Sequence, residues 1–225
     1  MAIATTPAIV QRAAAGTYDL MMHPLEHFRL RRIRKELIAR ARGRVLELGA
    51  GSGINIRHYQ PARVQSLTLS DRIDREMVYR SLLRRHLSGG NGIPLTIARI
   101  DAQRLPFADE SFDTVVGTLL FCSVPCAPCG FDEIARVLRP GGRYLFLEHV
   151  RPSRRTYGRL TDWINPVWHR LSGGCNLNRD TVKTMREAGF SVRTYHTGGK
   201  GRNGKGRSDV ADAGVFVWGE ATPPR

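Results

Sequence analysis

The stretch that decides the fold reads VLELGAGSGIN, residues 45–55. An apolar run there ends in three glycines at alternate positions, Gly49, Gly51 and Gly53, which is typical of a strand that turns sharply into a helix. Glycines let the backbone bend and approach a ligand that side chains would exclude. A nicotinamide loop would have its third glycine at the position of Ile54, and a phosphate loop would carry a lysine followed by serine or threonine. The pattern therefore matches neither of these common loops.

Three acidic residues flank this loop. Asp71 ends the next β-rich run, about 20 residues after the glycines, where a carboxylate can accept hydrogen bonds from both ribose hydroxyls. Asp101 ends the run after that, where an acid can accept from an adenine amine, and Glu47 precedes the loop, where it can hold an ammonium group. Each acid alone is also explained as a helix cap or a solvated strand end. Together, at the carboxyl edge of one sheet, the three acids predict an adenosine site.

Short β-rich runs alternate with helical ones along the chain, which favours βαβ units and a parallel sheet. We expect strands at residues 44–49, 64–71, 94–101, 112–120, 142–150, 190–196 and 213–221, and helices at 73–87, 131–138 and 180–188. A chain of 225 residues is long enough for one well-buried core and too short for two comfortable domains, so we expect a single domain.

The charge is strongly basic, with 35 Lys and Arg against 20 Asp and Glu, a net +15. This favours an acidic partner such as phosphate, an anionic membrane face or nucleic acid, although an arginine-rich sequence also arises from genomic base composition. Residues 24–42 combine apolar residues at helical spacing with basic residues between them. They predict a basic amphipathic helix that packs on the domain with a solvated face, or that also touches a membrane or closes over a site.

The N-terminus has no basic region followed by a continuous apolar stretch, so we expect no secretory signal. The most apolar segment, residues 117–131, is interrupted by Pro125 and Pro128 and is too short to span a bilayer. We therefore expect a soluble, cytoplasmic protein, with peripheral contact at the inner membrane face as a further option. In a reducing compartment its four cysteines are expected as thiols, ligands or nucleophiles and not as disulfides.

Four segments carry a family resemblance: VLELGAGSG, LSDRID, IDAQRLPFADESFDTVV and EIARVLRPGGRYLFLEH. They resemble motifs of the class I S-adenosylmethionine-dependent methyltransferases, and LPFADESFD followed by VLRPGG resembles the ubiquinone- and menaquinone-type subgroup. The match runs from about residue 18 to 219. It implies a Rossmann-like α/β fold with a seven-stranded, mostly parallel sheet in the order 3-2-1-4-5-7-6, helices on both faces and an antiparallel last strand. Residues 1–42 would form a lid and the basic helix, and residues 43–225 the catalytic core.

The resemblance also implies S-adenosylmethionine as cofactor. The residues expected to line it are Tyr18, in the lid, with Glu47, Gly49, Gly51, Gly53, Asp71, Arg72, Asp101, Ala102 and Thr118.

A narrower likeness concerns the methyl acceptor. TLLFCSV, LEHV and NPVWHRLSGGCNLNRDT resemble alkyl-thiol S-methyltransferases of animals and their bacterial relatives, some of which are assigned to phosphatidylethanolamine N-methylation. From the sequence we expect no counterpart of the membrane-anchoring N-terminal helix of the animal enzymes. We expect methyl transfer to a small thiol or sulfide. N-methylation of a phospholipid headgroup or another amine is the alternative, which the basic helix 24–42 and the net charge would suit. The acids around the glycine loop disfavour a third reading, a non-catalytic nucleic-acid binder using residues 200–207, and no specific nucleic acid is expected.

The acceptor is expected at the ends of the fourth and fifth strands. His149 is the candidate base for a thiol proton, and its alternatives are packing in the core or pairing with Glu148. Residues 162–179 are expected to cover the pocket, with Trp163 and Trp168 as an apolar wall. The other pocket candidates are Cys122, His169, Cys175 and Arg179.

Cys122, Cys126 and Cys129 have the CxxxCxxC spacing of iron–sulfur radical enzymes, and Cys175 would supply a fourth ligand for zinc. The resemblance puts Cys122 just past the fourth strand, in the substrate-facing loop, and the chain has no repeated barrel strands to surround a cluster. We therefore expect no metal.

Overall fold

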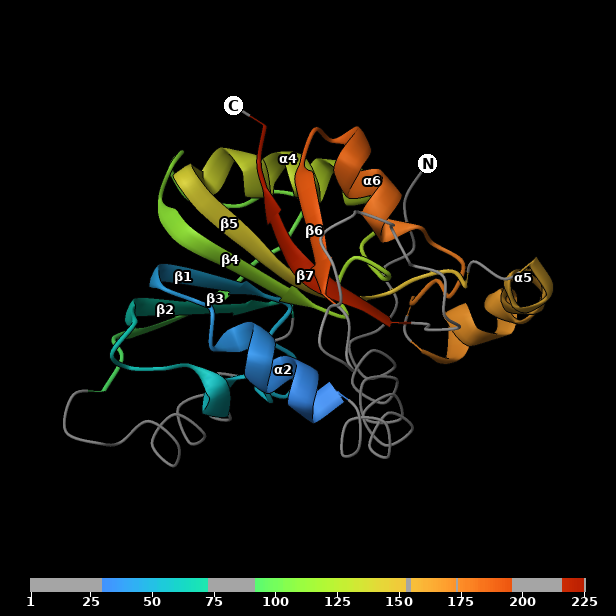
Figure 1. Cartoon of the computed structure of the whole chain (residues 1–225), viewed down its shortest axis with the longest axis horizontal. Helices are drawn as coiled ribbons and strands as arrows, with labels where there is room; N and C mark the ends of the chain where they lie inside the picture. The colour runs from blue at the N-terminus through green and yellow to red at the C-terminus, as the bar shows by residue number, and fades with distance from the viewer. Residues whose placement is uncertain (1–29, 73–91, 153–154, 173, 196–215, 225) are drawn as a thin grey trace, which may run out of the picture.

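A seven-stranded sheet forms the centre of the computed structural model, which describes residues 30–72, 92–152, 155–172, 174–195 and 216–224 (Figure 1). The strand order is β3-β2-β1-β4-β5-β7-β6. Neighbouring strands from β3 to β5 pair in parallel, and β7 pairs antiparallel with both β5 and β6. The fold, strand order and antiparallel last strand expected from the sequence are confirmed.

The strands are β1 Gly43–Leu48, β2 Val64–Asp71, β3 Leu95–Arg99, β4 Phe112–Thr118, β5 Leu138–His149, β6 Ser191–Tyr195 and β7 Phe216–Thr222. The helices are α2 Arg31–Ile38, the 3-10 turn η2 Ile56–His58, α4 Ala127–Val137, α5 Arg155–Leu171 and α6 Thr181–Glu187. The expected helix at residues 73–87, Tyr18 with the rest of the expected lid, and the basic segment 200–207 lie outside the described residues.

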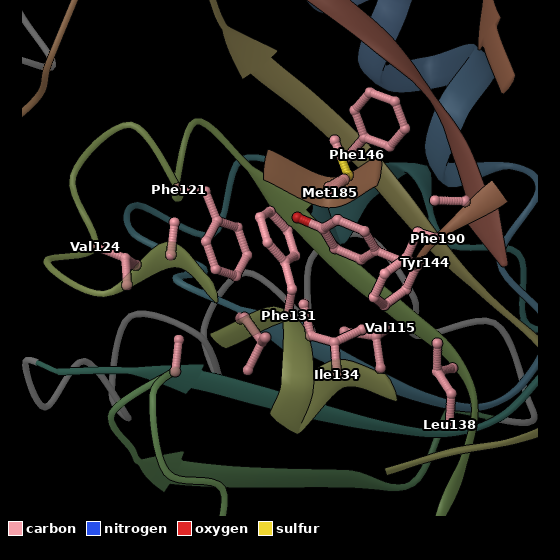
Figure 2. Packing of buried hydrophobic residues seen from close by; sticks show 14 of the residues in the cluster. Val115, Phe121, Val124, Phe131, Ile134, Leu138, Tyr144, Phe146, Met185 and Phe190 are labelled. Atoms are coloured by element: carbon pink, nitrogen blue, oxygen red, sulfur yellow. The ribbon is translucent and has the colours of Figure 1, made fainter. Parts of the chain in front are cut away.

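Apolar side chains on both faces of the sheet build two core layers. On β5, Tyr144 and Phe146 pack toward α4 and α6, whereas Leu145 and Leu147 pack toward α2. Figure 2 shows the first layer, in which Phe121 stacks on Phe131 with ring centroids 4.2 Å apart. Burial of such strand and helix faces is the main driving force for this architecture.

Helix α4 begins four residues before the expected start at Phe131. Cys126 is its N-cap, because the sulfur accepts a hydrogen bond from the Cys129 backbone N–H at 3.3 Å. Pro128 lies in the first turn, where a missing N–H costs no helical hydrogen bond. Cys126 and Cys129 form a disulfide, so the expectation of four thiols is wrong for this pair. Cys122 and Cys175 are free and buried.

Helix α5 projects beyond the sheet (Figure 1). The two tryptophans expected to form an apolar wall differ here, because the side chain of Trp163 is 79% exposed whereas Trp168 is half-buried. The register of α5 explains this, because residues three and four apart share a face and the side chains around Trp163 on that face are exposed too. They are Tyr157, Leu160, Ile164, Val167 and Leu171.

Helix α2 is the described part of the expected basic helix at residues 24–42. Arg31, Arg32 and Lys35 are exposed as expected, but Arg34 is only 4% exposed and lies on the buried face with Leu37. Within the described ranges, no helix is both long and apolar enough to cross a bilayer.

Candidate functional site

The glycine loop follows β1 at the carboxyl edge of the sheet. Gly49, Gly51 and Gly53 have φ of +64°, +56° and +74°, a left-handed backbone that glycine adopts without the strain of a Cβ. The backbone N–H of Gly51 donates to Oδ2 of Asp71 at 2.8 Å. This bond joins the loop to the end of β2, so the expected ribose acid lies directly beside the expected cofactor loop.

The loop leaves room at its middle glycine. Among the described residues, a Cβ at Gly51 would meet only the carbonyl oxygen of Gly49, at 3.9 Å. At Gly49 a Cβ would lie 2.7 Å from Cδ1 of Leu120, so this glycine is required for packing against the segment after β4. Among the described residues, the loop therefore has more space for a Cβ at Gly51 than at Gly49.

Glu47 is 1% exposed at the end of β1, and both its oxygens accept hydrogen bonds. Asn55 Nδ2 donates to Oε1 at 2.8 Å and the Tyr59 hydroxyl donates to Oε2 at 2.6 Å. Burial raises the pKa of Glu47, and these two bonds oppose that effect. Each oxygen keeps a second lone pair, so Glu47 can still hold an ammonium group, which remains a prediction.

Arg34 extends this buried network from α2. Its Nη1 donates to Oδ1 of Asn55 at 3.0 Å and to Oγ1 of Thr118 at 2.7 Å. Thr118, at the end of β4, also accepts from Asn55 Nδ2 at 3.0 Å. One guanidinium therefore joins α2, the glycine-loop segment and β4, and its charge lowers the pKa of the nearby Glu47. Sequence analysis placed Arg34 on the exposed basic face and missed this contact.

Asp101 follows β3 and is held by one side chain. Gln103 Nε2 donates to both its oxygens, at 3.0 and 3.2 Å, and the Gln103 backbone N–H donates to Oδ1 at 3.0 Å. Partial burial alone would raise the pKa of Asp101, but the bonds from Gln103 and the charge of Arg72 hold it below its usual value. Arg72 is exposed and Ala102 is buried on the same edge. Sequence analysis did not identify Gln103.

The expected acceptor side, formed by the segments after β4 and β5, contains the buried titratable side chains of Cys122, Cys175 and Glu148. Cys122 and Cys175 are 0% and 2% exposed, and contact between the thiols lowers the pKa of Cys175 to about 7 while raising that of Cys122. Glu148 is 0% exposed, and its Oε1 accepts from the backbone N–H groups of Leu120 and Phe121. The structure thus brings Cys122 and Cys175 together as expected and adds Glu148 to them.

His149 lies next to Glu148 on β5 but faces the opposite side of the sheet, against Phe216 at a ring distance of 5.4 Å. Burial lowers the pKa of His149 to about 4, and its Nδ1 has no hydrogen-bond partner. Burial raises the pKa of Glu148 to about 8. The pairing of His149 with Glu148 considered from the sequence is therefore wrong, because adjacent strand residues point to opposite faces.

The remaining pocket candidates, Trp168, Arg179 and His169, lie in different environments. Trp168 is half-buried, and its indole lies near enough to Cys175 to lower that thiol's pKa, although Nε1 makes no hydrogen bond of normal geometry. Arg179 Nη1 donates to the carbonyl oxygens of Phe121, at 2.6 Å, and Val124, at 2.5 Å, so it fixes the segment after β4. His169 is exposed, and its backbone oxygen accepts from the N–H of Gly174, the residue before Cys175.

The sequence is similar to known methyltransferases. Residues 46–146 match a methyltransferase domain family. A ubiquinone/menaquinone biosynthesis C-methyltransferase of Azotobacter vinelandii is 30% identical over 219 residues, which cover 85% of each chain. The chain belongs to the S-adenosylmethionine-dependent methyltransferases.

Two further comparisons refine this placement within the methyltransferases. A thiol S-methyltransferase of Homo sapiens is 34% identical over 149 residues, which cover 65% of this chain and 59% of the human protein. The chain thus spans less than two thirds of the length of this relative. An O-methyltransferase family protein of Burkholderia thailandensis shares the fold, with a TM-score of 0.64 over 95% of this chain and 59% of that protein at 15% identity.

Membership in this family implies S-adenosylmethionine as methyl donor, and the described residues fit it. The glycine loop and the carboxylate of Asp71 beside it are suited to the ribose, and Asp101 to the adenine amine. For metals, the described ranges contain no group of three or more His, Cys, Asp or Glu side chains that could hold an ion.

Proposed function

We propose that this methyltransferase transfers a methyl group from S-adenosylmethionine to a small thiol or sulfide. The observation that carries the acceptor class is the 34% identity over 149 residues to a thiol S-methyltransferase. The buried acceptor side supports it: Cys122, Cys175 and the apolar Phe121 suit a neutral sulfur compound better than a charged one.

When bound, the cofactor supplies a methyl group on a sulfonium centre, from which it leaves by in-line displacement. The protein's task is then to orient the acceptor and exclude water. The glycine loop and Asp71 would bind the adenosine, and the network of Glu47, Asn55 and Arg34 would fix the loop that follows.

A thiol acceptor must also lose its proton, whereas a sulfide has none to lose. A base works best when its pKa lies near the operating pH, and a free thiol, with a pKa of about 8.5, is mostly protonated there. The pKa of Glu148, about 8, is closer to neutral pH than that of His149, about 4, and it is the ionised fraction of Glu148 that would accept the thiol proton. Glu148 therefore replaces His149 as our preferred candidate base.

An acceptor panel with S-adenosylmethionine tests the proposal. Purified protein is incubated with an alkyl thiol, an aryl thiol, a thioether and phosphatidylethanolamine vesicles, and products are identified by mass spectrometry. We expect methylation of at least one sulfur acceptor, and much less of it with Asp71→Ala at a cofactor concentration near the wild-type Kd. Methylation of ethanolamine alone would overturn the sulfur assignment.

The amine alternative has one observation of its own. Every large hydrophobic side chain that is exposed in the described residues lies on α5, and such a face suits the surface of an anionic membrane when basic residues accompany it. Trp163→Ser should reduce retention on anionic vesicles at low salt and leave thermal unfolding unchanged, because its side chain is 79% exposed. Equal retention of both proteins would remove this support.

A further inference from the structure

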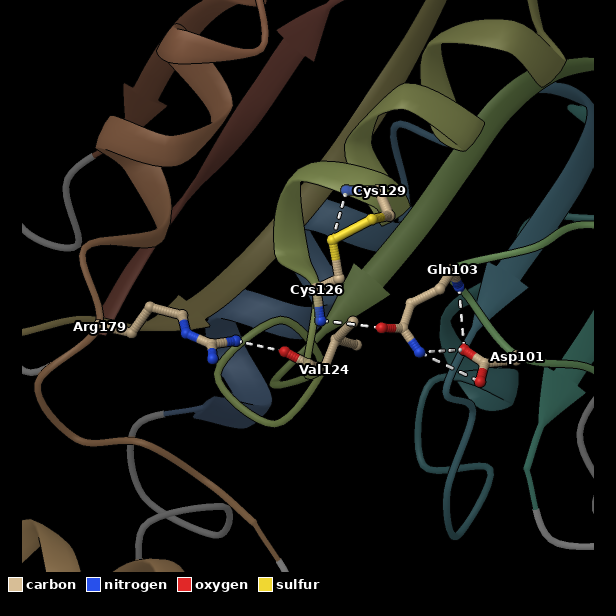
Figure 3. Close-up of a disulfide and its surroundings, with 6 residues drawn as sticks. All are labelled: Asp101, Gln103, Val124, Cys126, Cys129 and Arg179. Carbon is tan, nitrogen blue, oxygen red and sulfur yellow. Dashed lines mark hydrogen bonds between the residues drawn. A yellow bond between two sulfur atoms is a disulfide. The ribbon is translucent and has the colours of Figure 1, made fainter. Parts of the chain in front are cut away.

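The disulfide between Cys126 and Cys129 lies at the surface, at the start of α4 (Figure 3). Cys129 is exposed and Cys126 is half-buried. The chain here reads CAPC, two cysteines separated by two residues at the first turn of an 11-residue helix. An accessible disulfide in this position can be attacked by a thiolate from solution, because exchange requires access to one sulfur.

The geometry favours one direction of attack. The sulfur of Cys126 accepts a hydrogen bond from the Cys129 backbone N–H at 3.3 Å, at the positive end of the helix dipole. Both effects stabilise a thiolate on Cys126 and so make it the better leaving group. Attack is therefore expected at the exposed sulfur of Cys129.

The same turn is connected to the cofactor site. The Cys126 backbone N–H donates to Oε1 of Gln103 at 2.8 Å, and Gln103 donates to both oxygens of Asp101 (Figure 3). A single side chain thus joins the disulfide-bonded turn to the acid expected to bind adenine.

At its other end, the segment between β4 and α4 is fixed by Arg179, which donates to the carbonyl oxygens of Phe121 and Val124. The segment is therefore held by Arg179 on the acceptor side and by Gln103 on the adenine side. A change at Cys126 reaches Asp101 through two consecutive hydrogen bonds.

We propose that Cys126 and Cys129 form a thiol–disulfide exchange site, and that its reduction by small thiols weakens binding of S-adenosylmethionine. In the first step a thiolate bonds to the Cys129 sulfur, the Cys126–Cys129 bond breaks, and Cys126 leaves as a thiolate. A second thiol molecule then attacks the mixed disulfide, which releases Cys129 as a thiol and the small thiol as its own disulfide. The two electrons come from the two small thiols.

The oxidised protein should bind the cofactor more tightly because the disulfide restrains the turn at Cys126. The closed disulfide holds the Cys126 N–H where it fixes Gln103, and so keeps Asp101 in one orientation before the cofactor binds. Reduction removes this restraint. The turn must then become ordered when the cofactor binds, and the lost conformational entropy weakens binding.

The exchange step is tested by peptide mapping. Oxidised protein is treated with millimolar glutathione, quenched with an alkylating agent and analysed by mass spectrometry. We expect a glutathione adduct on Cys129, followed by alkylation of both Cys126 and Cys129, while the buried Cys122 and Cys175 stay unmodified. A pair that stays oxidised, or adducts confined to Cys122 and Cys175, would overturn the exchange site.

The coupling is tested by calorimetric titration of the cofactor analogue S-adenosylhomocysteine into oxidised and reduced protein. We expect the oxidised wild type to bind at least about fivefold more tightly, the low end of typical couplings between sites. The Cys126→Ser/Cys129→Ser double variant should give one affinity under both conditions, which controls for effects of the reductant.

Gln103→Leu separates exchange from coupling. This variant should exchange with glutathione like the wild type, since the disulfide is intact, but its affinity should depend much less on redox state because the path to Asp101 is cut. Equal affinities of oxidised and reduced wild type, or an undiminished dependence in Gln103→Leu, would overturn the coupling.

Discussion

Glu148 and His149 are consecutive residues on β5, and burial moves their pKa values in opposite directions, to about 8 and about 4. A carboxylic acid and an imidazole removed from water both favour their neutral forms. Near neutral pH both side chains are therefore largely uncharged, on opposite faces of the same strand. Environments that separate pKa values in this way are typical of sites that carry out proton transfer.

The stability of the protein should fall with rising pH because of Glu148. Its folded pKa of about 8 lies above the ordinary value of 4.5, so between these values the folded chain holds a proton that the unfolded chain has lost. This destabilising contribution is absent below about 4.5 and complete above about 8. Glu148→Gln stays neutral and keeps an oxygen for the two backbone N–H donors. The difference in melting temperature, Glu148→Gln minus wild type, should increase by about 2 °C or more when the pH is raised from 5 to 9, as measured by calorimetry. An unchanged difference across that range would mean that Glu148 is not protonated at neutral pH.

Acceptors of different acidity test the candidate base. Glu148→Gln should slow methylation of an alkyl thiol by about 100-fold, the low end for general-base catalysis, and should slow a more acidic thiol less. A thioether should be methylated at nearly the wild-type rate, because it has no proton to lose. His149→Asn serves as the matched comparison on the other face of β5. If Glu148→Gln lost equal methylation rate on thiol and thioether, Glu148 would be a structural group. If only His149→Asn lost rate selectively on thiols, His149 would be the base.

Asp71 should be required for cofactor binding. Asp71→Ala removes a carboxylate suited to both ribose hydroxyls and also the bond to the Gly51 N–H. Charge-assisted hydrogen bonds contribute about 1.5–3 kcal/mol, so we expect affinity for S-adenosylmethionine to fall about 10-fold to 150-fold by calorimetry. Unchanged affinity would show that the adenosine lies elsewhere.

Arg34 and Arg32 lie two positions apart on α2 and should differ sharply in their contributions to the unfolding free energy. Arg34→Met removes a buried guanidinium bonded to Asn55 and Thr118 and leaves Glu47 without its positive neighbour, so we expect about 3 kcal/mol lower unfolding free energy in urea. Arg32→Met removes an exposed ion pair with Glu36 at 3.0 Å and should change the unfolding free energy by less than about 1 kcal/mol. Similar small losses in both variants would mean that the Arg34 network does not stabilise the fold.

The sequence by itself determined the sheet and put the glycine loop, Asp71 and Asp101 at the edge where we expect the cofactor. Val64–Asp71 is a strand with the expected bounds, because alternating apolar residues and a terminal acid are local signals. The glycine loop, Asp71 and Asp101 were found in the same way, since their spacing along the chain follows from the βαβ repeat. The cap of α6 is local as well, because Asp180 accepts from the Lys183 N–H three residues later.

Only the tertiary structure decided what depends on orientation and on distant neighbours. Helical spacing did not show that Arg34 turns inward while Trp163 turns outward, because burial depends on which face the rest of the fold covers. The link from Cys126 through Gln103 to Asp101 joins the edge after β3 to the start of α4, so no local pattern contained it. The pKa values of Glu148 and His149 come from burial, which exists only once the chain has packed around them.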